Sequence, residues 1–150
     1  MSLDEVPGAY VVVDASVSLK WALDDEEAVD QAVALRDASV VERRFDMVVP
    51  SLWVYEVTNG LVTAVRRGRL VPEGGAQAMA CMLALGIRLA DPDPEDVYEK
   101  ALRHGIAAYD AAYLALAEAL DASLWTGDRR FYEKVGAATD RVHWIGDFPL

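Results

Sequence analysis

Short apolar runs alternate with longer stretches of helical pattern along this chain. Tyr10 to Val13 is a continuous apolar run with three valines, which is typical of a strand buried on both faces of a parallel sheet. Shorter runs predict four further strands, at residues 47–49, 87–89, 123–126 and 142–145. The alternation predicts an α/β protein with a βαβα order, in which helices cover a central, mostly parallel sheet of about five strands.

Helical patterns fill the segments between these runs. Two helical segments follow the first strand, SVSLKWAL and EEAVDQAVALRDA. After the second strand, Pro50 stops the strand and Ser51 can cap the next helix, LWVYEVTNGLVTAVRRG, which ends at Gly68. Three more helices are expected within residues 72–85, 95–105 and 106–120. The lone Cys81 falls in the first of these three, where the pattern predicts a small buried side chain.

Four acids stand where these elements end or begin. Asp14 ends the first strand, Asp128 follows the fourth beyond Gly127, Glu56 lies in the first turns of its helix, and Asp110 opens the apolar helix. Ligands of open parallel sheets bind outside the carboxyl ends of the strands, near the point where the strand order reverses. Taken alone, Asp14 and Asp110 would be interpreted as helix caps and Asp128 as a turn residue, but together the four acids predict one acidic pocket.

Such a pocket is suited to a divalent metal. Carboxylates held close together repel one another unless a cation neutralises them, and Mg2+ or Mn2+ is the cation that oxygen ligands select. We expect Asp14 and Asp110 to ligate the metal directly or through water, with Asp128 as a further ligand; Asp128 and Glu56 complete the acidic ring and orient the attacking water. The pattern therefore indicates a nuclease or phosphatase.

Three polar residues could support these acids. Ser16 and Thr126 place hydroxyls beside Asp14 and Asp128, where they could bond a carboxylate or a phosphate oxygen, although capping of the local backbone is an equally good interpretation. Asn59 lies one helical turn beyond Glu56 and could reach the pocket or lie on the helix surface. His104 and His143 have no partnered acid or serine and receive no role.

Composition limits the function classes further. A chain of 150 residues with 53% apolar content predicts one domain, residues 1–150. The net charge of -11 counts against a nonspecific nuclease, but arginines cluster and could line a phosphate path or be solvated helix ends. They stand at 43–44, at 66, 67 and 69, and at 129–130. The first ten residues lack a secretion signal and no apolar run approaches the ~20 residues of a membrane span, which predicts a cytoplasmic protein.

Four blocks carry a resemblance to a known family over nearly the entire chain. VVVDASVSLKW, VVPSLWVYEVTNGL, YDAAYLALAEAL and TGDRRF resemble, in order and spacing, the signature blocks of the PIN-domain ribonucleases, in the VapC-type toxin branch of prokaryotic toxin–antitoxin modules. The resemblance implies that Asp14, Glu56, Asp110 and Asp128 form a metal site, and that a PIN-like α/β/α sandwich surrounds a five-stranded parallel sheet. It also implies RNA cleavage leaving 5'-phosphate and 3'-hydroxyl ends, a homodimer, and inhibition by a small antitoxin whose tail occupies the active-site groove.

Three further functions are compatible with parts of this pattern. A phosphorylated receiver domain also gathers acids at strand ends, but it needs a lysine at a strand end, and SLWTG and VHWI contain none. The chain could also be a catalytically inactive PIN-like interaction scaffold or a housekeeping RNA-processing nuclease. The RNA that is cut depends on groove shape and loop contacts, and the net negative charge suggests a filter that repels bulk RNA.

Overall fold

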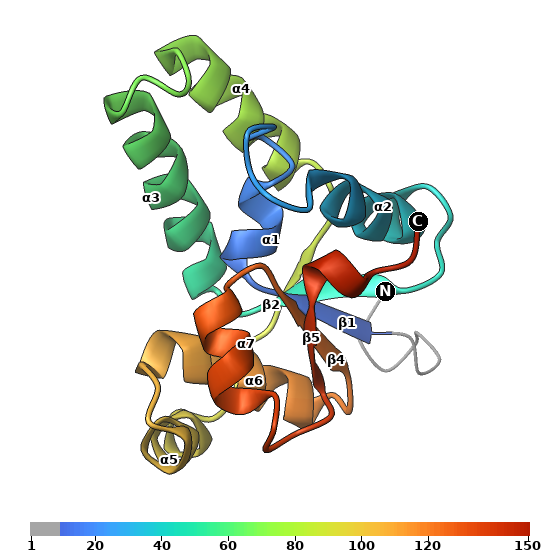
Figure 1. Cartoon of the computed structure of the whole chain (residues 1–150), viewed down its shortest axis with the longest axis vertical. Coiled ribbons are helices and arrows are strands. Elements are labelled where there is room, and N and C mark those ends of the chain that lie inside the picture. Colours follow the sequence, from blue (N-terminus) through green and yellow to red (C-terminus); the bar gives the residue numbers. More distant parts are fainter. Residues whose placement is uncertain (1–9) are drawn as a thin grey trace.

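Five parallel strands form the central sheet of the structure, a computed structural model that describes residues 10–150 (Figure 1). The first ten residues, used above to argue against secretion, fall outside this range except for Tyr10. The strand order is β3-β2-β1-β4-β5, so the order reverses between β1 and β4. The strands are β1 (Tyr10–Val13), β2 (Asp46–Val49), β3 (Arg88–Leu89), β4 (Ser123–Thr126) and β5 (Val142–Trp144).

The strands at the centre of the sheet are buried on both faces. Val12, Val13, Val48 and Leu124 have no exposed surface, which is the reason that their sequence reads as apolar runs without alternation. Val13 of β1 pairs with Trp125 of β4, so these two strands end side by side. The residues that follow them therefore meet at one edge of the sheet.

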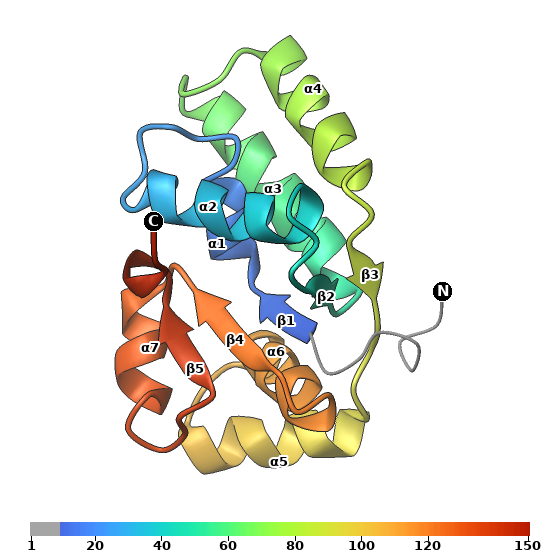
Figure 2. The ribbon, with the colours of Figure 1, turned by 90° about the vertical axis from the view of Figure 1, so that its right-hand side faces the viewer.

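Helices cover both faces of this sheet, as Figures 1 and 2 show. The α1, α2, α3 and α4 helices lie on one side, and α5 and α6 lie on the other, with α5 packed against α6. The predicted α/β/α sandwich is confirmed. The helices are α1 (Ala15–Leu19), α2 (Val29–Val40), α3 (Leu52–Arg66), α4 (Pro72–Leu83), α5 (Pro94–His104), α6 (Ala108–Ala119) and α7 (Arg129–Val135), followed by the short 3-10 helix η2 (Ile145–Asp147).

Several local predictions are corrected by the structure. The first helix ends at Leu19, earlier than its pattern suggested, because the chain then turns. The Ser51 hydroxyl makes no capping bond to α3 but binds the Asp91 carboxylate at 2.9 Å. Cys81 is exposed, because α4 buries Gly75 and Met82 and leaves Cys81 on another face of the helix. The prediction of a buried cysteine was wrong.

The helix α7 was not expected from the sequence. Its residues are mostly polar, but Phe131 and Val135 are spaced one turn apart and both are buried. Asp128 caps this helix, which ties the acid after β4 to a fixed position. Within residues 10–150, no helix is long and apolar enough to span a bilayer.

Candidate active site

Asp14 and Asp128 lie at the carboxyl ends of β1 and β4, where the strand order reverses. Each caps the helix that follows: Asp14 Oδ1 accepts from the Val17 N–H at 3.3 Å, and Asp128 Oδ1 accepts from the Phe131 N–H at 3.1 Å. The Asp14 N–H donates to the Trp125 carbonyl at 3.2 Å, which joins the two strand ends. Capping therefore fixes both carboxylates beside each other at the switch point of the sheet.

Two hydroxyls connect these acids. The Ser16 hydroxyl donates to the Asp14 carboxylate and accepts the Gly127 N–H at 2.8 Å. Thr126 has no exposed surface; its hydroxyl accepts the Asp128 N–H at 3.0 Å and its side chain also hydrogen-bonds to Asp14. Ser16 and Thr126 thus bond both to a site carboxylate and to the local backbone. Bonding to the acids and capping of the backbone, offered above as alternatives, therefore occur in the same residues.

A buried lysine lies next to this junction. A Cβ atom on Gly127 would lie 2.7 Å from Lys20 Cε and 3.1 Å from the Ser16 carbonyl oxygen, so only glycine allows this close approach. Lys20 is 4% exposed, and its Nζ donates to the Glu27 carbonyl. Burial lowers the pKa of Lys20, and nearby acids including Asp14 oppose that shift. Sequence reasoning gave Lys20 no role, although a charged residue within an apolar segment was a visible signal.

The other two acids of the site lie on helices, Glu56 on α3 and Asp110 on α6. The Tyr113 hydroxyl donates to Glu56 Oε1 at 2.6 Å, and Tyr113 is only 2% exposed. Asp110 is the third residue of α6, one helical turn before Tyr113. Tyr113 received no role from the sequence, but its spacing from Asp110 places both residues on one face of α6 and was the available signal.

The pKa values of the acids show that they influence one another. Burial raises the pKa of Asp14 to about 6, hydrogen bonds from Ser16, Thr126 and the Val17 N–H oppose the rise, and the charge of Asp128 adds to it. Burial also raises the pKa of Glu56, against the Tyr113 hydrogen bond, and the charge of Asp110 raises it further. Burial raises the pKa of Asp110, and the negative charge of Asp128 raises it further.

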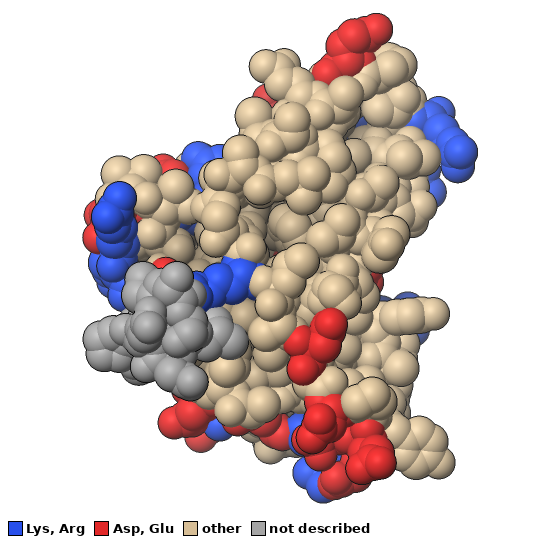
Figure 3. Space-filling model, turned by 180° about the vertical axis from the view of Figure 1, so that it is seen from behind, with Lys and Arg blue, Asp and Glu red and all other residues tan. Residues whose placement is uncertain are grey.

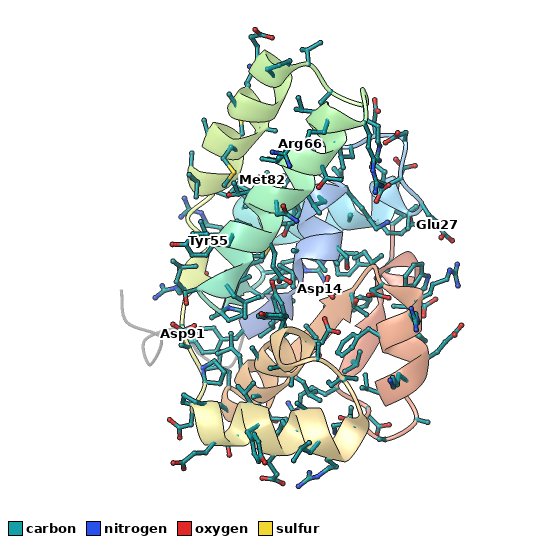
Figure 4. All side chains as sticks on the ribbon, turned by 90° about the vertical axis from the view of Figure 1, so that its left-hand side faces the viewer. Asp14, Glu27, Tyr55, Arg66, Met82 and Asp91 are labelled. Carbon is teal, nitrogen blue, oxygen red and sulfur yellow. The ribbon has the colours of Figure 1, made fainter. Side chains whose placement is uncertain are left out.

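All four predicted acids are therefore brought together. Asp14 interacts with Asp128, Asp128 with Asp110, and Asp110 with Glu56. Figure 4 shows Asp14 at the middle of this side of the molecule, with α3 above it and α5 and α6 below. Four elements that are distant in sequence thus supply one acidic site.

The residues of this site fit a hard divalent cation. The donors are carboxylate and hydroxyl oxygens, the ligands that Mg2+ and Mn2+ prefer, and a cation would offset the raised pKa values of the acids. Within residues 10–150, no three acidic, histidine or cysteine side chains lie close enough together in this structure to ligate one metal ion. Ligation by Asp14, Asp110 and Asp128 stays a prediction.

Residues outside this cluster have simpler positions. Asn59 is exposed on α3, and its predicted supporting role is untested. His104 ends α5, and the His143 ring in β5 stacks on Trp125 with centroids 4.8 Å apart. Neither histidine makes a contact with the four acids among the interactions of the described chain.

The arginines differ in what holds them. Arg129 follows Asp128 directly, pairs with Glu27 at 2.5 Å, and lies over the Trp144 ring at 4.3 Å from the centroid. Arg69 pairs with two acids of the same 24–27 loop, Asp25 at 2.7 Å and Glu26 at 2.8 Å. Two of the predicted phosphate-path arginines are therefore engaged with this loop.

Comparison with known proteins places the chain in a family. The family model for the PIN domain matches residues 11–136, a span that contains all four acids. The chain belongs to the PIN-domain family. The resemblance to PIN-domain ribonucleases of the VapC type, inferred above from four short blocks, is confirmed.

Similar PIN-domain proteins match along most of the chain. Ribonuclease VapC3 of Pyrobaculum aerophilum is 34% identical over 132 residues, which are 85% of this chain and 95% of that protein. Ribonuclease VapC9 of Mycobacterium tuberculosis is 34% identical over 122 residues, 80% of this chain and 87% of that protein. The crystal structure of PAE2754 from Pyrobaculum aerophilum superposes with a TM-score of 0.67 at 25% identity and covers 91% of both chains.

Proposed function

We propose that this PIN domain is a divalent-metal-dependent endoribonuclease and the toxin of a toxin–antitoxin pair. The observation that carries the proposal is the convergence of Asp14, Glu56, Asp110 and Asp128 from four separate elements. The relatives named as VapC ribonucleases support the choice of RNA over other phosphodiesters. Residues 1–150 act as one domain in this proposal.

The residues have distinct parts in the proposed reaction. Asp14, Asp110 and Asp128 would hold Mg2+ or Mn2+, which when bound neutralises phosphate charge and lowers the pKa of water. The Tyr113 hydroxyl holds one oxygen of Glu56, so that the other can orient a water in line with the phosphorus. Water adds to phosphorus as the bond to the 3'-oxygen breaks, leaving a 5'-phosphate and a 3'-hydroxyl.

Cleavage of total cellular RNA with Mg2+ or Mn2+ tests this function. The rate for Asp14→Asn and Asp110→Asn should fall about 100-fold or more, since each change removes a carboxylate from the site. Asp30→Asn is the matched control, because Asp30 is exposed on α2. Cuts at a few sites that vanish in both site variants support the proposal, and sequencing of the ends identifies the RNA. Absence of cleavage by the wild type would favour the inactive scaffold instead.

Protein partners form the second part of the proposal. An apolar groove of about 330 Å³ lies between α3 and α4, lined by Leu61, Val62, Val65 and Met79 among others, and Tyr55 is exposed nearby on α3. Such a surface supports a homodimer, and the VapC-type family supports a small antitoxin as inhibitor. The protein would bind both its RNA substrate and its antitoxin in the cytoplasm. Light scattering should give twice the chain mass, and a monomer would contradict the dimer.

A further inference from the structure

A small pocket beside the acidic site contains positive charge as well. Its volume is about 220 Å³, and Asp110 and Asp128 form one part of its lining while Arg130 and Lys134 form another. The turn of residues 105–107, between α5 and α6, supplies the rest together with Phe131. Two of the proposed metal-binding acids thus share a pocket with two cations.

The two cations of this pocket are available to a ligand. Arg130 and Lys134 stand four residues apart on α7, so they project from one face of the helix, and both are exposed. Within residues 10–150 neither forms an ion pair, whereas the adjacent Arg129 pairs with Glu27 at 2.5 Å. The chain has 25 acidic and only 14 basic residues, so two cations without an acidic partner in one pocket indicate a site for an anionic ligand.

The backbone around the pocket also suits an anion. Ala107 is the N-cap of α6 and makes no side-chain capping bond, so the N–H groups of the first helical turn begin at this pocket without a side-chain partner. Gly105, the left-handed C-cap of α5 with a φ of 63°, lines the pocket together with Lys134. Side chains and backbone thus favour negative charge at the same place.

We propose that the Arg130–Lys134 pocket binds the RNA backbone phosphate next to the one that is cleaved. This inference rests on the proposed ribonuclease function. The four acids repel a polyanion, so a strand whose reacting phosphate lies at Asp110 and Asp128 needs a nearby positive contact to hold its register. Arg130 and Lys134 supply that contact without touching the reacting phosphate. They are positioning residues that act through the neighbouring nucleotide.

The test is RNA binding by the full chain, measured as fluorescence anisotropy of a short labelled oligouridylate over a series of salt concentrations. All proteins carry Asp14→Asn, which slows cleavage about 100-fold or more, so that the RNA stays intact during the measurement. The Arg130→Gln/Lys134→Gln double variant should bind about tenfold more weakly at low salt. The slope of log affinity against log salt should also become shallower by about 0.7, the value for one lost contact to a single-strand phosphate.

A matched control separates this contact from general charge. Arg36→Gln/Arg141→Gln removes the same charge from two arginines outside the three arginine clusters, one on α2 and one just before β5. It should leave the affinity and the slope unchanged. An equal effect of both double variants would overturn the proposal, as would an unchanged slope for the Arg130 and Lys134 pair. Thermal melting of each variant confirms that the fold is intact.

The position of the phosphate is tested with modified RNA. Oligouridylates with a 5'-phosphate and with a 5'-hydroxyl should lose affinity equally in the Arg130 and Lys134 variant, because an internal phosphate is bound. Loss with the phosphorylated end alone would assign the pocket to a terminal phosphate and overturn the proposal. Because binding is measured without cleavage, these results are independent of the total-RNA assay, whose failure would instead contradict the ribonuclease function.

Discussion

The surroundings of Asp14 disfavour its ionised carboxylate form. Its pKa is about 6 in the fold against an ordinary value of 3.8, chiefly because the carboxyl is buried. Between these values the folded state binds more protons than the unfolded state, so the free energy of unfolding falls as the pH rises from about 4 to about 6. Above pH 6 the ionised carboxylate destabilises the metal-free protein by about 3 kcal/mol.

Asp14→Asn should therefore stabilise the metal-free protein at neutral pH. Asparagine keeps an oxygen acceptor for the Val17 N–H and the Ser16 hydroxyl but has no charge to bury. In EDTA at about pH 7.5, denaturant unfolding should show a gain of about 2 kcal/mol, which disappears at about pH 4 where Asp14 of the wild type is protonated. Saturating Mn2+ should raise the stability of the wild type and narrow this gap.

The exposed acid of α2 provides the comparison for this experiment. Asp30→Asn removes an exposed carboxylate outside the site and should change the free energy of unfolding by no more than about 0.5 kcal/mol. If Asp14→Asn is instead less stable than the wild type in EDTA at neutral pH, the capping bond to α1 outweighs burial of the charge, and the interpretation of Asp14 as a strained carboxylate is wrong.

At the scale of elements, the ends of β1 and β4 are held together at one glycine. The Gly127 N–H donates to the Ser16 hydroxyl, and Lys20 packs where a side chain at 127 would lie. Gly127→Ala must displace the Ser16 carbonyl as well as Lys20, which should destabilise the protein by about 1–3 kcal/mol. Asp14 and Asp128 flank this contact, so RNA cleavage should fall about tenfold or more.

A second glycine shows what the same change does without a close contact. In α4, a Cβ at Gly74 would lie 3.5 Å from Val71 Cγ2, an ordinary distance. Gly74→Ala should raise stability by about 0.5–1 kcal/mol and leave cleavage unchanged, because alanine favours the helix. Thermal melts and cleavage assays of the two variants side by side decide the point. Equal stability changes would show that the β1–β4 junction tolerates a side chain.

The sequence predicted the elements well where local pattern and burial coincide. The run 10–13 matches β1 because the strand lies at the centre of the sheet, where apolar residues are buried on both faces. The run 123–126 matches β4 although its sequence, SLWT, has a polar residue at each end. The helix α7 was missed because RRFYEKV offers only Phe131 and Val135 as buried apolar positions. Its cap, Asp128, was recognised as a site residue but not as the start of a helix.

Contacts between distant segments were beyond local pattern. The Ser51 hydroxyl binds Asp91, 40 residues later, and the Tyr113 hydroxyl binds Glu56, 57 residues earlier. No periodicity encodes such pairs, since they depend on how helices pack after the sheet has formed. The four acids were found only because strand ends and helix starts meet at one edge of any parallel α/β sheet, whatever the details of packing.

At the scale of the whole molecule, acidic side chains also gather outside the candidate site. Figure 3 shows acidic side chains gathered over α5, on the face opposite to the view of Figure 1. Glu95 and Asp96 belong to the first turn of that helix and are exposed. With a net charge of -11, the protein repels RNA at long range, and only local cations favour its approach.

Removing part of this repulsion should reduce discrimination between RNAs. Glu95→Gln/Asp96→Asn should increase cleavage of unrelated RNAs by about two- to fivefold at low ionic strength, because long-range repulsion slows their encounter. The rate on the RNA identified by cut-site mapping should change less, since its affinity rests on contacts within the groove. At high salt the two proteins should be equal, because the Debye length falls to about 3 Å at 1 M. Initial rates at both ionic strengths measure this, and an equal increase for target and unrelated RNA would mean that the acidic surface does not act as a filter.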